Sequence, residues 1–344
     1  MPRAGLLLVA TALAAAFVAG GVRGGIERLT SVVMPVVFAI LLGLAAYAVT
    51  FAEWDTAVAF LFTPDLSVLA DPALWSAAVG QVFFSLSVGQ GIMLTYGSYM
   101  DEDTDLVSSA VLVTVADVGA AVLAGLVIFP IVFTAGLQPT LGTELAFTTL
   151  PAAFEAMAFG RVVAVAFFGL LFFAALSSAV ALLEVGVAAA ATTTRLNRRR
   201  ATALLTGGVF LAGVPSALSY SPLDLAVAGR PVLDVVDESV GTYALPVSAV
   251  SIAVVFVWLA DLEGLRDDLG RLYPLVRYLV PTALVLVTGA KLVGVARPAW
   301  RLLVSRVPDG LHGVVVTVAV LTVLLGLGWL LRERIGRARR RTRR

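Results

Sequence analysis

The feature that most constrains this chain is a succession of long apolar segments, each able to cross a lipid bilayer. A crossing α-helix needs about 20 mainly apolar residues. Such segments lie near residues 4–22, 31–51, 73–99, 106–135, 161–193, 202–220, 240–260, 275–296 and 311–331. We therefore predict an all-α, polytopic membrane protein with about nine transmembrane helices. Residues 1–344 would form a single transmembrane domain.

Composition supports this class and excludes others. The mean hydropathy is +0.98, and only 14% of residues are charged, against about 25% in soluble proteins. The net charge of +1 gives no reason to expect nucleic-acid binding. The chain has no cysteine, its single histidine is His312, and it contains no catalytic motif. We expect neither an enzyme nor an organic cofactor.

The distribution of arginine predicts the orientation in the cell membrane. Arginines follow the first, fifth, seventh and ninth segments, at Arg23 and Arg28, at 195–200, at 266–277 and in a basic tail at 332–344. Loops rich in arginine stay in the cytoplasm, so the C-terminus is predicted inside and the N-terminus outside. The acidic run at 101–105 is an exception on an inner loop, and acidic residues count little in this rule. The outward N-terminus carries Arg3 and has no convincing cleavage site, which we interpret as upstream helices missing from the chain.

A Gly-Gln-Gly sequence interrupts the third apolar segment, in "SLSVGQGIMLTYGS" at 85–98. Glycine costs roughly 1 kcal/mol in a helix interior, and a glutamine amide in hydrocarbon needs hydrogen-bonding partners. One interpretation is close packing of small residues between two helices. The other is a helix broken near 87–91, which a membrane tolerates only where the freed backbone lines a cavity or meets a ligand.

An acidic side chain, Asp117, lies about midway through the fourth apolar segment. A carboxylate at that depth costs at least about 2.5–3.5 kcal/mol. Asp117 is either protonated or paired to another helix, or it has a function, and no basic residue deep in the membrane is available to pair with it. A bound cation or a proton is its natural partner.

Small and polar residues share one face of the fifth segment. Ala174, Ser177 and Ser178 are spaced i, i+3 and i+4, so they are neighbours on a helix. The serines either hydrogen-bond to carbonyls of their own helix or, with the Ala174 carbonyl, hold a small hard cation. Glu184 follows on the same segment, and we interpret it as structural, bonded between helices.

Five stretches resemble the neurotransmitter:sodium symporter family and occur in the order of that family. They are "GGIERLTSVVMP" at 24–35, "GQVFFSLSVGQGIMLTYGSYM" at 80–100, "GLVIFPIVFTAG" at 125–136, "LAFTTLPAAF" at 145–154 and "LLFFAALSSAVALLEV" at 170–185. The resemblance implies an inverted-repeat core of five plus five helices. It also implies import of an amino acid or related amine together with sodium ions.

By this resemblance the chain contains the family's helices four to twelve, with Gly-Gln-Gly in the broken sixth helix. One sodium site would include the Ser85 hydroxyl and Asp117, and a second would include Ala174, Ser177 and Ser178. The substrate would be lined by the following residues: Phe84, Ser87, Gly89, Gln90, Ser178 and Leu182. Asp237 matches the acidic member of an outer gate.

The resemblance also shows where this sequence departs from the family. Helices one to three would supply further sodium and substrate ligands and the gate arginine, so we expect the chain alone to be an inactive fragment. Gln90 replaces a bulky apolar residue, which leaves the substrate open. Chloride-dependent members have a neutral asparagine at the position of Asp117 and a hydroxyl residue one turn on, where this chain has Ala121. We therefore expect transport without chloride.

The sequence thus favours a sodium-coupled symporter of an amino acid or small amine, in contact with the lipid bilayer. Two alternatives stay open, a membrane partner or regulatory protein without ion coupling, and a channel. A homodimer is compatible with the sequence.

Overall fold

The computed structural model describes residues 2–101, 103–140, 142–219, 221–223, 225–227, 229–259, 266, 269–286 and 288–289. The chain divides into two compact units. Unit 1 comprises Met1–Ala70, Leu94–Glu102 and Ser108–Val235, and unit 2 comprises Asp71–Met93, Asp103–Val107 and Val236–Arg344. Each unit is described below by itself.

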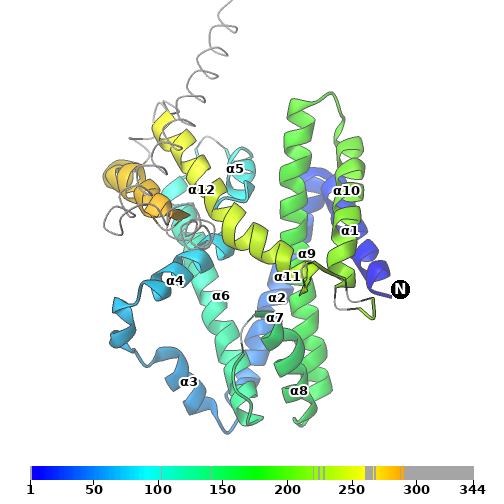
Figure 1. The fold of residues 1–344 in the computed structure, drawn as a ribbon, viewed down its shortest axis with the longest axis vertical. Helices are drawn as coiled ribbons and strands as arrows, with labels where there is room; N and C mark the ends of the chain where they lie inside the picture. Colours follow the sequence, from blue (N-terminus) through cyan, green and yellow to red (C-terminus); the bar gives the residue numbers. More distant parts are fainter. Residues whose placement is uncertain are drawn as a thin grey trace, which may run out of the picture. The chain divides into compact units, whose positions relative to one another are not determined.

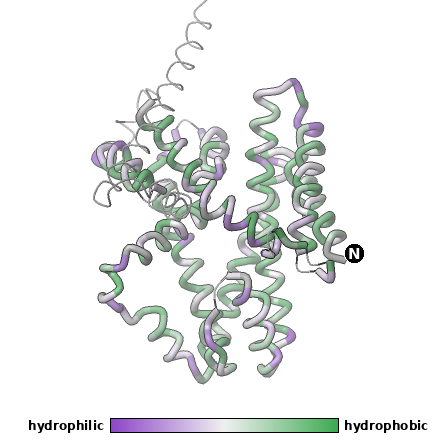
Figure 2. Tube along the Cα trace, in the orientation of Figure 1, coloured by the Kyte–Doolittle hydropathy of each residue, from purple (hydrophilic) through white to green (hydrophobic). Residues whose placement is uncertain are grey.

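Unit 1 is built mainly from long apolar helices. They are α1 (Pro2–Ala19), α2 (Glu27–Ala48), α6 (Leu106–Thr134, of which 106–107 belong to unit 2), α9 (Gly160–Thr193) and α10 (Arg198–Leu218). A π-helical turn at Val22–Ile26 joins α1 to α2. Figure 1 shows α1 and α10 side by side along α9, and Figure 2 shows that these helices are hydrophobic over most of their length.

Shorter elements connect these helices. They are α3 (Trp54–Phe62), a 3-10 turn (Leu66–Ala70), α5 (Ile92–Gly97, whose first two residues belong to unit 2), α7 (Gly142–Glu144), a π turn (Leu145–Thr149), α8 (Leu150–Glu155), the antiparallel pair β1 (Ala226–Val227) and β2 (Arg230–Pro231), and α11 (Val232–Asp237, whose last two residues belong to unit 2). In the pair, Ala226 lies opposite Pro231 and Val227 opposite Arg230.

Two clusters of buried apolar side chains hold unit 1 together. The first joins α2, α6, α8 and α9 around Ile131, Leu150 and Phe154. The second joins α1, α2, α9 and α10 around Val18, Val180 and Val187. The helices α2 and α9 contribute to both clusters, so they connect the two halves of the core of unit 1.

Unit 2 centres on the packing of α4 (Pro72–Ser85) against α12 (Leu245–Ala253). Phe83, Leu245, Ala249, Val250 and Leu284 form its buried cluster. A π-helical segment precedes α12 and another follows it, at Glu238–Ala244 and Val254–Leu259. Further turns lie at Gly270–Leu272 and Leu275–Leu279.

Most of the predicted apolar segments appear as helices. Among the described residues, five helical spans are long and apolar enough to cross a membrane: Val22–Ala48, Leu106–Thr134, Gly160–Thr193, Arg198–Leu218 and Val232–Val257. The first predicted segment is a shorter apolar helix, Ala4–Ala19. The segment at 73–99 is interrupted, as described below. The segment at 311–331 and the basic tail at 332–344 lie outside the described residues.

Candidate functional site: a broken helix and polar positions on the long helices

The third predicted segment is a helix with a break in its middle. Helix α4 ends at Ser85 and α5 begins at Ile92, with non-helical turns between them. Three residues of the break have positive φ angles, which are 55° at Ser87, 87° at Gly89 and 80° at Gly91. Glycine adopts such angles at no steric cost, which explains why two of the three residues are glycines. The non-helical turns between α4 and α5 confirm the predicted break at 87–91. A continuous helix with close-packed glycines is wrong for this segment.

The break is nevertheless a place of close approach. A Cβ atom on Gly89 would lie 2.7 Å from the Leu245 carbonyl oxygen and 2.9 Å from the Ala249 nitrogen. Local hydrogen bonds shape the turn, because the Val88 amide donates to the Phe83 carbonyl at 2.9 Å. The Ser248 hydroxyl of α12 donates to the Gly89 carbonyl at 2.7 Å. The glycine therefore serves both the turn and the contact with α12.

The predicted substrate-lining residues of unit 2 and the predicted sodium ligand Ser85 lie on this break or on the helical turn before it. Phe84 and Ser85 end α4 and are exposed, with Phe84 at 63%. Ser87, Gly89 and Gln90 are half-buried within the break. Asp237, the predicted gate acid, is the exposed last residue of α11.

The remaining predicted site residues lie on two helices of unit 1. Asp117 is half-buried near the middle of α6. On α9 the Ser177 hydroxyl donates to the Ala174 carbonyl at 2.8 Å. This is the bond within the helix that the sequence analysis gave as one of two alternatives for these serines. This bond brings two of the predicted sodium ligands together. Ser178 and Leu182 are exposed on α9, Leu182 at 49%.

The predicted residues thus form two groups, one in each unit. Unit 2 carries Phe84, Ser85, Ser87, Gly89, Gln90 and Asp237, and unit 1 carries Asp117, Ala174, Ser177, Ser178 and Leu182. Their union in one binding site remains a prediction. Among the described residues no cluster of three or more His, Asp or Glu side chains could hold a metal. The predicted sodium ligands supply carbonyl, hydroxyl and carboxylate oxygens, which are the donors that hard cations prefer.

The sequence predicts that Glu184 has a structural role and bonds to another helix, but it does not show which residues are its partners. The Glu184 carboxylate is fully buried and accepts from both terminal nitrogens of Arg198 of α10, at 3.0 and 2.5 Å. It also accepts from the Tyr99 hydroxyl at 2.7 Å, and Arg198 Nε donates to the Val18 carbonyl at 2.9 Å. The structure confirms the structural role of Glu184. The presence of a carboxylate in an apolar segment was the signal that a cation must be near.

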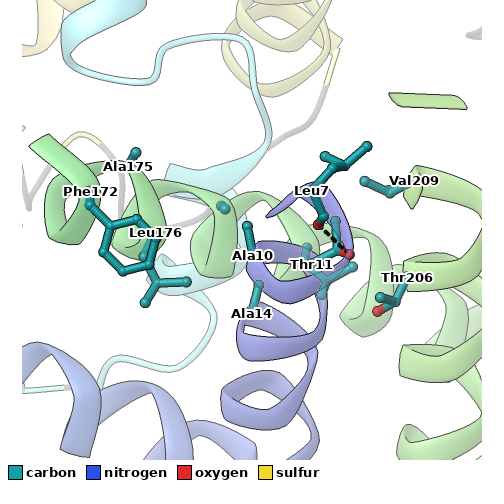
Figure 3. Close-up of a pocket in the computed structure, with 11 residues that line it drawn as sticks. Leu7, Ala10, Thr11, Ala14, Phe172, Ala175, Leu176, Thr206 and Val209 are labelled. Carbon is teal, nitrogen blue, oxygen red and sulfur yellow. Dashed lines mark hydrogen bonds between the residues drawn. The ribbon is translucent and has the colours of Figure 1, made fainter. Parts of the chain in front are cut away.

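Unit 1 also contains a largely apolar cavity of about 320 Å³ between α1, α9 and α10 (Figure 3). The cavity is lined by Leu7, Ala10, Thr11, Ala14, Phe172, Ala175, Leu176, Ala179, Leu183, Thr206 and Val209. Its α9 residues recur at i, i+3, i+4 and i+7 from Phe172, on the side of the helix opposite Ala174, Ser177 and Ser178. The α9 residues that line the cavity therefore do not include the predicted sodium and substrate positions of that helix.

Comparison with known proteins places these features in one family. The model of the sodium:neurotransmitter symporter family matches residues 3–296. The sodium-dependent transporter YhdH of Bacillus subtilis is 33% identical over 81% of this chain and 64% of its own length. A sodium-dependent transporter of Haemophilus influenzae is 34% identical over 69% of this chain and 52% of its own length.

A solved structure and a more distant relative agree with this assignment. The crystal structure of MhsT in complex with L-phenylalanine matches with a TM-score of 0.72 and 38% identity, over 82% of this chain and 66% of that one. The sodium-dependent nutrient amino acid transporter 1 of Drosophila melanogaster is 28% identical over 67% of this chain and 37% of its own length. This chain is a multi-pass membrane protein that spans about two thirds or less of the relatives it matches, and it belongs to the sodium:neurotransmitter symporter family.

Proposed function

We propose that this protein imports an amino acid or a related small amine across the cell membrane together with sodium ions. The observation that carries the proposal is the break at 86–91 between α4 and α5, in a chain that belongs to a family of sodium symporters. Broken helices expose backbone groups that bind substrates and ions in the middle of a membrane. The amino-acid assignment is supported by the phenylalanine bound to MhsT and by the name of the Drosophila relative.

We further propose that oxygen atoms of unit 1 bind sodium. The Ala174 carbonyl and the Ser177 hydroxyl lie 2.8 Å apart, and Ser178 is the next residue on α9. The Ser177 hydroxyl donates to this carbonyl. An ion that takes both oxygens requires that hydrogen to rotate away, which a free hydroxyl rotor allows. The second proposed group of sodium ligands joins Asp117 of unit 1 with Ser85, which belongs to unit 2.

The carboxylate of Asp117 supports transport without chloride. A fixed negative charge beside a sodium ion offsets its charge inside a medium of low dielectric, which is the role an exchangeable anion would otherwise have. The C-terminus is proposed to face the cytoplasm and the N-terminus of the sequence to face outside, because of the arginine distribution.

Uptake into proteoliposomes tests the proposal. The complete gene product is reconstituted with each of twenty radiolabelled amino acids outside and with an inward gradient of sodium, potassium or choline. The proposal expects accumulation of at least one amino acid with sodium alone, unchanged when gluconate replaces chloride. A channel would equilibrate the solute without accumulating it, and a regulatory subunit would show no uptake. Either result would contradict the proposal.

A further inference from the structure

Ser248 uses its hydroxyl differently from its neighbour on the same helix. The helical run from Val232 to Leu259 comprises α11, α12 and their π-helical segments. Ser251 is exposed and donates to the Val247 carbonyl of its own helix at 2.8 Å. Ser248 is half-buried and donates outside its helix, to the Gly89 carbonyl at 2.7 Å. The hydroxyl is thus directed at the broken segment.

The acceptor is a backbone group that the break has released from helical bonding. Away from water, such a carbonyl needs a partner from elsewhere in the protein. Gly89 lies in the centre of the break with a φ of 87°, and its carbonyl is met by Ser248. One side-chain hydroxyl therefore stabilises the non-helical conformation of a segment that the proposed function places against substrate.

Packing reinforces this contact on both sides. Ala249, next to Ser248, is 2% exposed, and the Leu245 side chain is 8% exposed. A Cβ on Gly89 would approach the Ala249 nitrogen to 2.9 Å, so the break lies directly against α12 with no room between them. A displacement of the break must move α12 or break the Ser248 hydrogen bond.

The same helical run carries Asp237. This residue precedes Ser248 by about three turns, and both residues belong to unit 2. In the described part of the chain, Ser248 supplies the side-chain hydrogen bond to the Gly89 carbonyl. The run thus links the broken segment, through one hydrogen bond, to the residue proposed as the gate acid.

We propose that Ser248 is a positioning residue that couples the broken segment to the helix carrying Asp237. The inference rests on the proposed function, which places binding at the broken segment, and on the family resemblance, which matches Asp237 to the acid of an outer gate. Occupancy of the broken segment and the position of the Asp237 carboxylate then change together. Loss of the Ser248 hydroxyl makes the broken segment less stable. Occupancy of that segment then no longer changes the position of the Asp237 carboxylate.

Hydrogen exchange and one spin label test the coupling in the complete gene product, purified and placed in lipid nanodiscs. The amides of Leu86, Ser87 and Val88 are hydrogen-bonded in the break, so their exchange rates report its stability. Residues 1–344 contain no cysteine, so Val240→Cys, an exposed position three residues after Asp237, is the labelling site within them. The variants are Ser248→Ala, Ser248→Thr, which keeps a hydroxyl, and Ser251→Ala as the matched control.

The proposal expects about tenfold faster exchange at 86–88 in Ser248→Ala and wild-type rates in Ser251→Ala and Ser248→Thr. Sodium should change the mobility of the label at 240 in the wild type and not in Ser248→Ala. Equal exchange in wild type and Ser248→Ala would overturn the proposal, and so would a sodium response at 240 that survives the alanine. If sodium changes neither the exchange at 86–88 nor the label at 240 in the wild type, the proposed sodium-coupled function is contradicted. The comparison of exchange rates between wild type and Ser248→Ala in potassium still decides the role of Ser248.

Discussion

The carboxylate of Glu184 and the guanidinium of Arg198 form a two-pronged ion pair inside unit 1. Glu184 is fully buried, whereas the Arg198 side chain is 30% exposed. With the Tyr99 hydroxyl and the Val18 carbonyl, the pair connects α1, α9, α10 and the turn after α5. Removal of one partner from a buried pair leaves an uncompensated charge, which costs about 3–5 kcal/mol. The two partners should therefore respond unequally to mutation.

Arg198→Ala should lower the free energy of unfolding more than Glu184→Gln does. The first change leaves the buried carboxylate without its cation and costs about 3–5 kcal/mol. The second leaves an arginine that can turn toward solvent and a glutamine that still accepts a hydrogen bond. Thermal unfolding in detergent measures both, with exposed Arg199→Ala as control. Equal loss in Arg198→Ala and Arg199→Ala would show that the pair does not stabilise the fold.

Gly89→Ala should disrupt the broken helix. The φ of 87° disfavours any side chain, and the added methyl would lie 2.7 Å from the Leu245 carbonyl. We expect a loss of about 1–3 kcal/mol and faster hydrogen exchange at 86–91. Gly97→Ala, at the end of α5 with open space around its Cβ position, should be neutral. Wild-type exchange in Gly89→Ala would contradict the geometry of the break.

Substitution by valine at two threonines of α10 should change the free energy of unfolding in opposite directions. The Thr206 hydroxyl is buried with no hydrogen-bond partner among the described residues, and it borders the apolar cavity of Figure 3. Thr206→Val removes an unsatisfied polar group and should stabilise the protein by about 1 kcal/mol. The Thr202 hydroxyl donates to the Arg198 carbonyl at 2.9 Å, so Thr202→Val should destabilise by a similar amount. Thermal unfolding decides between these signs, and destabilisation by both changes would refute the assignment for Thr206.

The membrane helices and the break were predictable from sequence because their causes are local. Apolar length specifies a membrane span, and two glycines around Gln90 mark a place where a helix does not continue. The predicted limits of the break agree closely with the structure, because the break was predicted at 87–91 and occupies 86–91. Glu184 was also recognisable, because a buried carboxylate must be paired.

The partners of these residues could not be predicted, because they depend on packing between distant segments. Tyr99 lies 85 residues from Glu184 in sequence, and Ser248 lies 159 residues from Gly89. A single serine in an apolar helix does not show whether it bonds within its helix, as Ser177 and Ser251 do, or outside it. Only the three-dimensional arrangement of α4 and α12 assigns Ser248 to the break.

Asp117→Asn should weaken sodium activation of transport and create sensitivity to chloride. A carboxylate about 4 Å from sodium contributes several kcal/mol at an effective dielectric of 20, part of which desolvation offsets. We expect the sodium concentration for half-maximal uptake to rise on the order of tenfold. Replacement of gluconate by chloride should partly restore it. Asp103→Asn, an exposed acid before α6, is the control, and equal sodium affinity in wild type and Asp117→Asn would remove Asp117 from the site.

Amino-acid accumulation driven by a sodium gradient tests the central claim most directly. The complete gene product in proteoliposomes should concentrate a labelled amino acid inside when sodium is outside, and a sodium ionophore should abolish the accumulation. Replacement of sodium by potassium at the same membrane potential should leave only equilibration. Accumulation of equal size in potassium, or accumulation that follows a proton gradient without sodium, would contradict sodium-coupled symport.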